Sequence, residues 1–165
     1  MNQIRTIQDA LTRNPLSIKG KDIKRKTTEK YLGEIISSHG VADSVKTTIN
    51  DRKGRIIASI YELGSILEDF RMQVAGGLVS GLKIWMFGLL PSLLANSEMW
   101  TEISEDDIQS LEDIQHLLLQ RIFSVPKTTP HAALRWHTGA VSLEMEITKR
   151  KLLFLHHVIN MDENS

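Results

Sequence analysis

The chemistry that this chain could carry depends first on its histidines. The sequence contains six of them and no cysteine. His156 and His157 are adjacent, so on a helix they point in different directions. Neither His131 nor His137 belongs to an HExxH frame or has a carboxylate four residues away. We therefore expect ordinary surface or capping histidines and no metal site.

A second candidate for metal chemistry is the acidic run Glu105-Asp106-Asp107, which Asp113 follows. Two-metal chemistry needs carboxylates that converge from separate elements. Consecutive acidic residues at the start of a helix instead interact with the positive end of the helix dipole. With Ser104 before it as a cap, the run predicts the beginning of a helix and no magnesium site.

Motifs of nucleotide binding and nucleophilic catalysis are absent from the sequence. No GxxxxGK[ST] or GxGxxG frame follows a strand-like segment, and no GxSxG motif occurs. The lack of cysteine excludes a thiol nucleophile, a disulfide framework and a zinc finger. We expect no catalytic residue, no cofactor and no enzyme activity from this chain on its own.

Positive charge is concentrated in the first third of the chain. The twenty basic and twenty acidic residues balance overall, but residues 1–60 hold twelve Lys or Arg against six Asp or Glu. This excess fits either contact with a polyanion such as nucleic acid or a solvated face, and both interpretations stay open. The basic residues in question are Lys19, Lys21, Lys24, Arg25, Lys26, Lys30, Lys46, Arg52, Lys53 and Arg55.

Length and composition favour a helical domain inside the cell. The 165 residues suit one compact domain, and 5% aromatic residues with ten glycines and four prolines favour helices over a sandwich or barrel. Residues 1–11 are polar and lack the apolar core of a secretory signal, so we expect a cytoplasmic or nuclear protein. Ile4 to Leu11 predicts a short helix that Asn14-Pro15 breaks.

Strand-like composition follows this first segment. Leu16, Ile18 and Ile23 flank Lys19-Gly20-Lys21, where the glycine suits a hairpin turn. The run from Tyr31 to Ile36 predicts a further strand, which Ser38-His39-Gly40 ends. We expect two or three antiparallel strands.

A long helix is predicted from about Asp43 to Phe70, with Asp43 or Ser44 as its cap. Lys46 and Lys53 are seven residues apart and share one flank of its apolar seam, while Arg52 lies on the opposite flank. The seam recurs at spacings of mostly three and four residues and comprises Ile49, Ile56, Ile60, Leu63, Leu67 and Phe70.

The segment from Val74 to Ala95 has the length of a membrane span, but its composition argues against one. Lys83 lies at its centre, and a lysine there costs about 2.5–3.5 kcal/mol on insertion. Several glycines and Pro91 dilute the segment further. We therefore expect a buried helix of a bundle and no membrane contact.

Three more helices are predicted after this segment. The first runs from Ser104 through Phe123, the second begins at Pro130 and ends at Thr138-Gly139, and the third begins near Ser142 and frays after Asn160. The second packs Leu134 and Trp136, and the third buries Ile147, Leu152, Leu155 and Ile159. The expected fold is mainly α, with a small antiparallel β-hairpin in residues 1–40 followed by a bundle of four or five helices in residues 41–165.

Several segments, taken in order, resemble the reverse transcriptases of non-LTR (LINE-type) retrotransposons. Residues Lys30-Tyr31-Leu32-Gly33 are similar to the "KYLG" strand of that family, and residues 96–100, Asn-Ser-Glu-Met-Trp, to its "YGSE.W". Residues 118–123, 133–139 and 147–159 resemble its "LLR.I.G", "AL..E.G" and "I..R.L.F" patterns. Asn96 stands where the family usually has glycine, and His137 where it usually has glutamate. The likeness covers most of residues 16–160.

In that family the YLG hairpin is the primer grip at the end of the palm, and the helices after it form the thumb that holds the primer–template duplex. The resemblance therefore implies an RNA-directed DNA polymerase fragment that contacts an RNA or DNA duplex. It places Lys46, Asn50 and Lys53 near duplex phosphates, and Lys30, Tyr31 and Gly33 on the primer side. The catalytic aspartates of the palm have no counterpart here, because no Asp-Asp pair precedes Tyr31.

A second hypothesis requires no nucleic acid. A domesticated helical module would use its apolar helices to meet a protein partner, a missing palm domain or a second copy of itself. In that case the lysines are solvated, Tyr31 is a packed strand residue, and Gly33 only accommodates the backbone. Salt-dependent binding to a duplex separates the two hypotheses.

Overall fold

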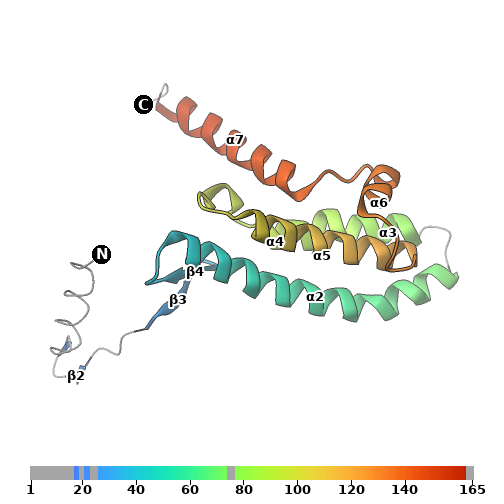
Figure 1. Cartoon of the computed structure of the whole chain (residues 1–165), viewed down its shortest axis with the longest axis horizontal. Helices are drawn as coiled ribbons and strands as arrows, with labels where there is room; N and C mark the ends of the chain where they lie inside the picture. The colour runs from blue at the N-terminus through green and yellow to red at the C-terminus, as the bar shows by residue number, and fades with distance from the viewer. Residues whose placement is uncertain (1–16, 19–20, 23–25, 74–76, 163–165) are drawn as a thin grey trace.

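The computed structural model describes residues 17–18, 21–22, 26–73 and 77–162 (Figure 1). Two short strand pairs precede a long helix and a helical bundle, which confirms the expected fold class. The helix predicted from Ile4 to Leu11 lies outside the described residues.

Two antiparallel pairs make up the strand region. Strands β1 (Ser17–Ile18) and β2 (Lys21–Asp22) pair where a hairpin is predicted. Strands β3 (Thr28–Tyr31) and β4 (Glu34–Ser37) form a separate two-stranded sheet. The prediction of one strand from Tyr31 to Ile36 is therefore wrong, and two or three strands is too few. The chain reverses between β3 and β4.

The reversal depends on two residues with positive φ. Leu32 and Gly33 have φ of 48° and 86°, as a two-residue hairpin turn with the twist of its strands requires. Glycine adopts this conformation freely, whereas a leucine pays a steric penalty for it. Tyr31 and Glu34 face each other across the end of the ladder.

The long helix, α2, covers Val41–Gln73 and so extends beyond both predicted ends. Its first turn begins after Gly40, whose carbonyl accepts from the Ser44 amide at 3.1 Å. Neither Asp43 nor Ser44 is the cap, because both lie within the helix. The predicted seam is buried at Ile49, Ile56 and Ile60, and Leu63 is half-buried against it. The side chains of Leu67 and Phe70 lie outside the description.

The predicted helix from Val74 to Ala95 is interrupted. The structure has α3 (Gly77–Ile84), a π-helical turn η1 (Trp85–Leu89) and α4 (Leu90–Leu93). Pro91 explains the wider turn, because it has no amide to donate to the carbonyl one α-turn earlier. The Leu90 amide accordingly donates to the Trp85 carbonyl, five residues back. Within the described ranges, no helix combines the length and apolar character needed to cross a membrane.

Local sequence rules predicted α5 (Glu105–Phe123) and α6 (His131–Thr138) correctly. A short 3₁₀ turn, η2 (Ser97–Met99), precedes them. Ser104 and Asp107 form a capping box at the start of α5, and Gly139 ends α6 with φ of 67°. Leu134 is buried as expected. Trp136 is not packed, because 84% of it is exposed.

The last helix, α7, covers Leu143–Asp162 and leaves the bundle part-way along its length (Figure 1). Ile147 is buried, which confirms that part of the prediction. Leu152, Leu155 and Ile159 are exposed, so the prediction that they are buried is wrong. Their apolar spacing is helical, but the bundle ends before it reaches them.

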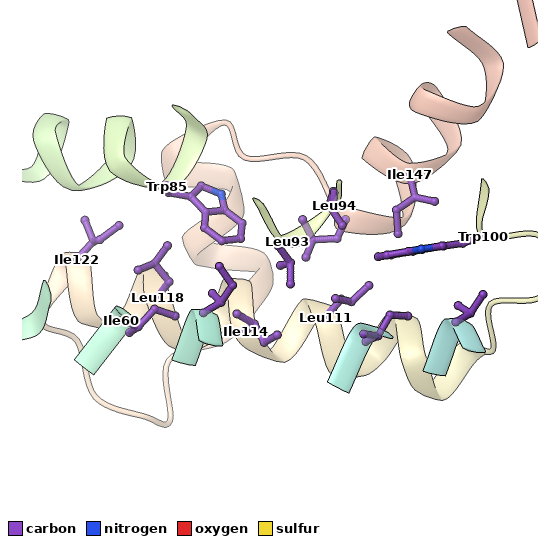
Figure 2. Close-up of a cluster of buried hydrophobic side chains, with 14 residues drawn as sticks. Ile60, Trp85, Leu93, Leu94, Trp100, Leu111, Ile114, Leu118, Ile122 and Ile147 are labelled. Atoms are coloured by element: carbon purple, nitrogen blue, oxygen red, sulfur yellow. The ribbon is translucent and has the colours of Figure 1, made fainter. Parts of the chain in front are cut away.

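The core lies between α2, α5, the α3–α4 segment and the base of α7. Figure 2 shows Trp85 on one side of Leu93, and Trp100 on the other side between Leu111 and Ile147. Both tryptophans are almost completely buried. The α3–α4 segment and the residues after it pack over α5, and the two tryptophans lie at opposite ends of this contact.

Candidate nucleic-acid interface

The β3–β4 hairpin is held along the first turns of α2. The Ser37 amide donates to Ser44 Oγ at 2.8 Å, and the Ile35 amide donates to Thr48 Oγ1 at 2.8 Å. One turn along α2, from Ser44 to Thr48, therefore corresponds to two residues back along β4, from Ser37 to Ile35. Thr48 and Ser44 face the hairpin, and this side of α2 fixes its position.

Arg52, one turn beyond Thr48, completes the attachment from inside the protein. Its side chain is only 3% exposed, and its Nη2 donates to the Gly33 carbonyl at 3.1 Å and to Glu34 Oε1. Its Nη1 donates to the Ala95 carbonyl. The guanidinium also lies 5.4 Å from the centre of the Trp100 ring. Arg52 lies on the flank of the seam opposite Lys46 and Lys53, as predicted, and it is buried there because it joins three segments of the chain.

Glu34 and Trp100 close this cluster. The Trp100 Nε1 donates to Glu34 Oε2 at 3.4 Å, so the carboxylate has a partner on each oxygen. Nearby Asn96 has φ of 53°, in the left-handed region that favours glycine and asparagine. We call Gly33, Glu34, Arg52, Ala95 and Trp100 the Arg52 cluster.

The attached hairpin presents its tip to solvent. Tyr31 is 64% exposed, so the alternative that it is a packed strand residue is wrong. Lys30 is also exposed, but its Nζ donates to Asp51 Oδ2 at 3.0 Å. This hydrogen bond, with help from Arg55, holds the pKa of Asp51 below its usual value despite partial burial. Gly33 contributes its carbonyl and its positive φ, and carries no side chain that could bind.

Lys46, Asn50 and Lys53 share one flank of α2, as their spacing predicts, but they differ in their surroundings. Lys46 and Asn50 are exposed. Lys53 is half-buried, and its Nζ donates to Ser110 Oγ of α5 at 2.6 Å. Lys53 therefore contributes to packing between α2 and α5 more than to the surface.

The six predicted residues form two groups on different sides of α2. At about 100° per residue, Lys46, Asn50 and Lys53 lie roughly 140–160° around the axis from Thr48, which faces the hairpin. Lys30, Tyr31 and Gly33 lie on the hairpin side. The structure thus brings the members of each group together and keeps the two groups apart.

A second polar cluster lies elsewhere, between α5 and α6. The rings of His116 and His131 stack 4.7 Å apart, and His131 Nε2 bonds to Gln115 Oε1 at 3.1 Å. Burial, followed by the charges of Arg135 and His116, lowers the pKa of His131 to about 4. His131 is therefore neither a surface nor a capping histidine as predicted.

Glu112 connects this cluster to the base of α7. One oxygen accepts from the Leu143 amide at 2.7 Å, and the other lies 3.3 Å from Arg135 Nη1. The described residues contain no group of three or more His, Asp or Glu side chains suited to a metal ion. The cluster holds the helices together.

A cavity of about 380 Å³ opens at the base of α7, away from the hairpin. Its walls are mostly apolar and include Trp85, Phe87 and Val141, while Glu146 and Lys149 provide charge. Glu146 also accepts from Arg150 at 3.3 Å. None of the six predicted site residues lines this cavity.

No protein-family model, curated protein or solved structure matches this chain.

Proposed function

We propose that the chain holds a nucleic-acid duplex through its sugar–phosphate backbone, as the primer grip and thumb of a reverse transcriptase do, and that it does not catalyse by itself. The β3–β4 hairpin corresponds to the grip and the bundle from α2 onward to the thumb. The proposal follows the resemblance in sequence and goes with an intracellular location, cytoplasmic or nuclear.

One observation carries the proposal: two of the segments that resemble the family meet in space. Gly33 of the "KYLG" segment and Trp100 of the "YGSE.W" segment are 67 positions apart in sequence, and both contact Arg52. Ala95, directly before the second segment, accepts from the same guanidinium. The resembling segments thus both contribute to the Arg52 cluster, which holds the hairpin in place.

The Arg52 cluster gives the hairpin and its exposed Tyr31 a fixed position, as recognition of a rigid backbone requires, whereas Lys46 and Asn50 are positioned by α2 itself. Tyr31 offers an aromatic ring and a hydroxyl at the hairpin tip, and Lys46 and Asn50 offer a cation and an amide on the other side of α2. Because the two groups lie on different sides of α2, one duplex would have to cross the exposed face of this helix, which is about 10–12 Å wide, to contact both. Such contacts position a duplex without selecting a sequence.

Fluorescence anisotropy with a labelled primer–template duplex tests this proposal. We expect sequence-independent binding that weakens steeply with salt. Lys46→Ala should lower the slope of log K against log salt by about one, and the further change Lys53→Ala should add little, because Lys53 is engaged with Ser110. Tyr31→Ala should weaken binding without changing the salt slope.

Lys127→Ala provides a matched control, because Lys127 is exposed in the loop between α5 and α6, at the far end of the bundle. It should bind duplex as the parent does. The proposal fails if the parent shows no affinity at low salt, or if Lys127→Ala and Lys46→Ala reduce binding equally.

A second candidate function is a protein-interaction module, and the α3–η1 segment favours it. Leu78, Val79, Met86 and Phe87 are exposed there, whereas neighbouring Trp85 is buried. Exposed apolar side chains gathered on one segment are typical of a protein contact. Binding to a protein through this surface would persist at high salt, whereas duplex binding would not.

A further inference from the structure

The outer half of α7 needs a partner that the bundle does not supply. From Leu152 onward, every residue whose burial is described is exposed, and most are large and apolar. An isolated helical segment of this length is marginal in water, because most helical stability comes from packing an apolar face. Something that covers this segment would stabilise it.

One exposed stripe has the spacing of a coiled-coil seam. Met145, Thr148, Leu152, Leu155 and Ile159 follow each other at intervals of three, four, three and four residues, and all are exposed. In heptad notation they occupy alternating a and d positions, the positions that interlock between two paired helices. The seam begins beside the bundle and continues along the outer half of the helix.

The bundle does not block this seam, because it packs on the opposite side of α7. Leu143 and Ile147 are the buried residues of the helix. At about 100° per residue they lie about 180° and 140° around the axis from Leu152, and about 120° and 80° from Leu155, and all the seam residues are exposed. A second helix can therefore approach the exposed seam from the side away from these two buried residues.

The charges beside the seam identify the second helix. Glu144 and Lys149 are exposed and occupy g and e positions on its two flanks, and the exposed Lys149 Nζ also lies 3.7 Å from Glu146 Oε2 of its own helix. In a parallel pair, a g residue meets the e residue five positions later on the other helix. Glu144 of each copy would then meet Lys149 of the other. A second copy of this chain supplies both residues in this register.

We propose that two copies of this chain associate through a parallel coiled-coil pairing of α7 along the seam from Met145 to Ile159. The seam is only about two heptads long, so the contact is smaller than the roughly 800 Å² per partner of standard stable interfaces. A weak, reversible dimer is therefore expected. An antiparallel pair would lose the Glu144–Lys149 matches.

Sedimentation velocity on protein freed of nucleic acid, from about 5 to 500 µM, tests the association. The parent should shift from monomer to dimer and keep this behaviour in 0.5 M NaCl, because apolar contacts resist salt. Leu152→Glu should remain monomeric. Leu153→Glu is the matched control: it is the same residue type, 60% exposed against 62%, but outside the seam, so it should dimerise as the parent does.

A cysteine cross-link tests the orientation independently of any loss of folding. The chain has no cysteine, so single substitutions report without background. Ile159→Cys should form a disulfide-linked dimer under mild oxidation, because equivalent a residues face each other in a parallel pair. Leu153→Cys should not. A parent that stays monomeric throughout, equal behaviour of the two glutamate variants, or no cross-link at position 159 would overturn the proposal.

Discussion

Arg52→Met should destabilise the protein considerably, although Arg52 is a charged residue on a surface helix. Methionine keeps most of the aliphatic stem, and removes the guanidinium that joins the hairpin to the rest of the protein. The carbonyls of Gly33 and Ala95 lose their donor, and Glu34 loses its counter-ion. The variant therefore isolates the polar part of the Arg52 cluster.

The size of the effect follows from burial. Removing one partner of a buried ion pair typically costs about 3–5 kcal/mol, because it leaves an uncompensated charge. Glu34 is 27% exposed and keeps its contact with Trp100, so water and the indole compensate part of that loss. We expect a decrease of about 2–3 kcal/mol in the free energy of unfolding. For a chain of this size that lowers Tm by about 5–10 °C.

Urea denaturation followed by circular dichroism measures this change. Arg55→Met is the control, because Arg55 lies one turn away on the same helix and also pairs with an acidic residue, Asp51, but is exposed. Exposed pairs contribute about 0–1 kcal/mol, so Arg55→Met should change stability by less than about 0.5 kcal/mol. Equal effects of the two substitutions would refute the argument from burial.

A double-mutant cycle sharpens the test. Glu34→Gln removes the charge of the partner and keeps its shape, so Arg52→Met should cost less in that background than in the parent. A coupling of about 1 kcal/mol or more is expected for residues in direct contact. Additive effects would mean that the ion pair does not contribute to the cluster, and that the carbonyl contacts alone hold Arg52.

Three further predictions concern other parts of the chain. Because burial lowers the pKa of His131 from 6.5 to about 4 in the folded state, protonation costs more there than in the unfolded chain, so stability is greatest above pH 6.5 and falls as the pH drops towards 4. Urea denaturation at pH 7 and pH 5 should show a smaller pH effect in His131→Gln. Leu32→Asn should raise Tm, since asparagine tolerates the φ of 48° and adds about 0.5–1 kcal/mol. Ser104→Ala should cost about 1 kcal/mol in the same urea experiment by removing the cap of α5.

Helix boundaries could be predicted where their causes are local. Ser104 caps α5 through Asp107, three residues away, and Gly139 ends α6 through its own φ. In both cases the residue that sets the boundary lies within one turn of it. The hairpin turn is local too, but Leu32 concealed it. A leucine seldom adopts positive φ, so strand composition outweighed the glycine that follows it.

The position of Arg52 on α2 could be predicted from its spacing, but its burial could not. Arg52 lies three residues after Ile49 and four before Ile56, at the interval of the buried seam. This spacing correctly places Arg52 on the flank opposite Lys46 and Lys53, but a charged residue is seldom buried, so its burial was not predicted. Its acceptors come from residues 33, 34 and 95, and no local rule brings these together.

The exposed half of α7 illustrates a different limit. Its apolar spacing correctly predicts a helix, but burial depends on how far the neighbouring helices extend. Ile147 and Leu152 differ little in type and lie on opposite sides of the point where the bundle ends. A periodic pattern indicates which face can be buried, and not whether a partner is present.

The residues that resemble the reverse transcriptases and lie in or beside the Arg52 cluster can be explained by the fold alone. Gly33, Asn96 and Trp100 belong to the resembling segments, and their environments explain them structurally: two have positive φ, and one packs beside a buried guanidinium. Residues of this kind are needed for the fold around the Arg52 cluster, whether or not nucleic acid is bound. The proposed duplex binding would instead depend on exposed residues, above all Tyr31 on the hairpin and Lys46 on α2, and substitutions at these two separate the proposed function from the fold.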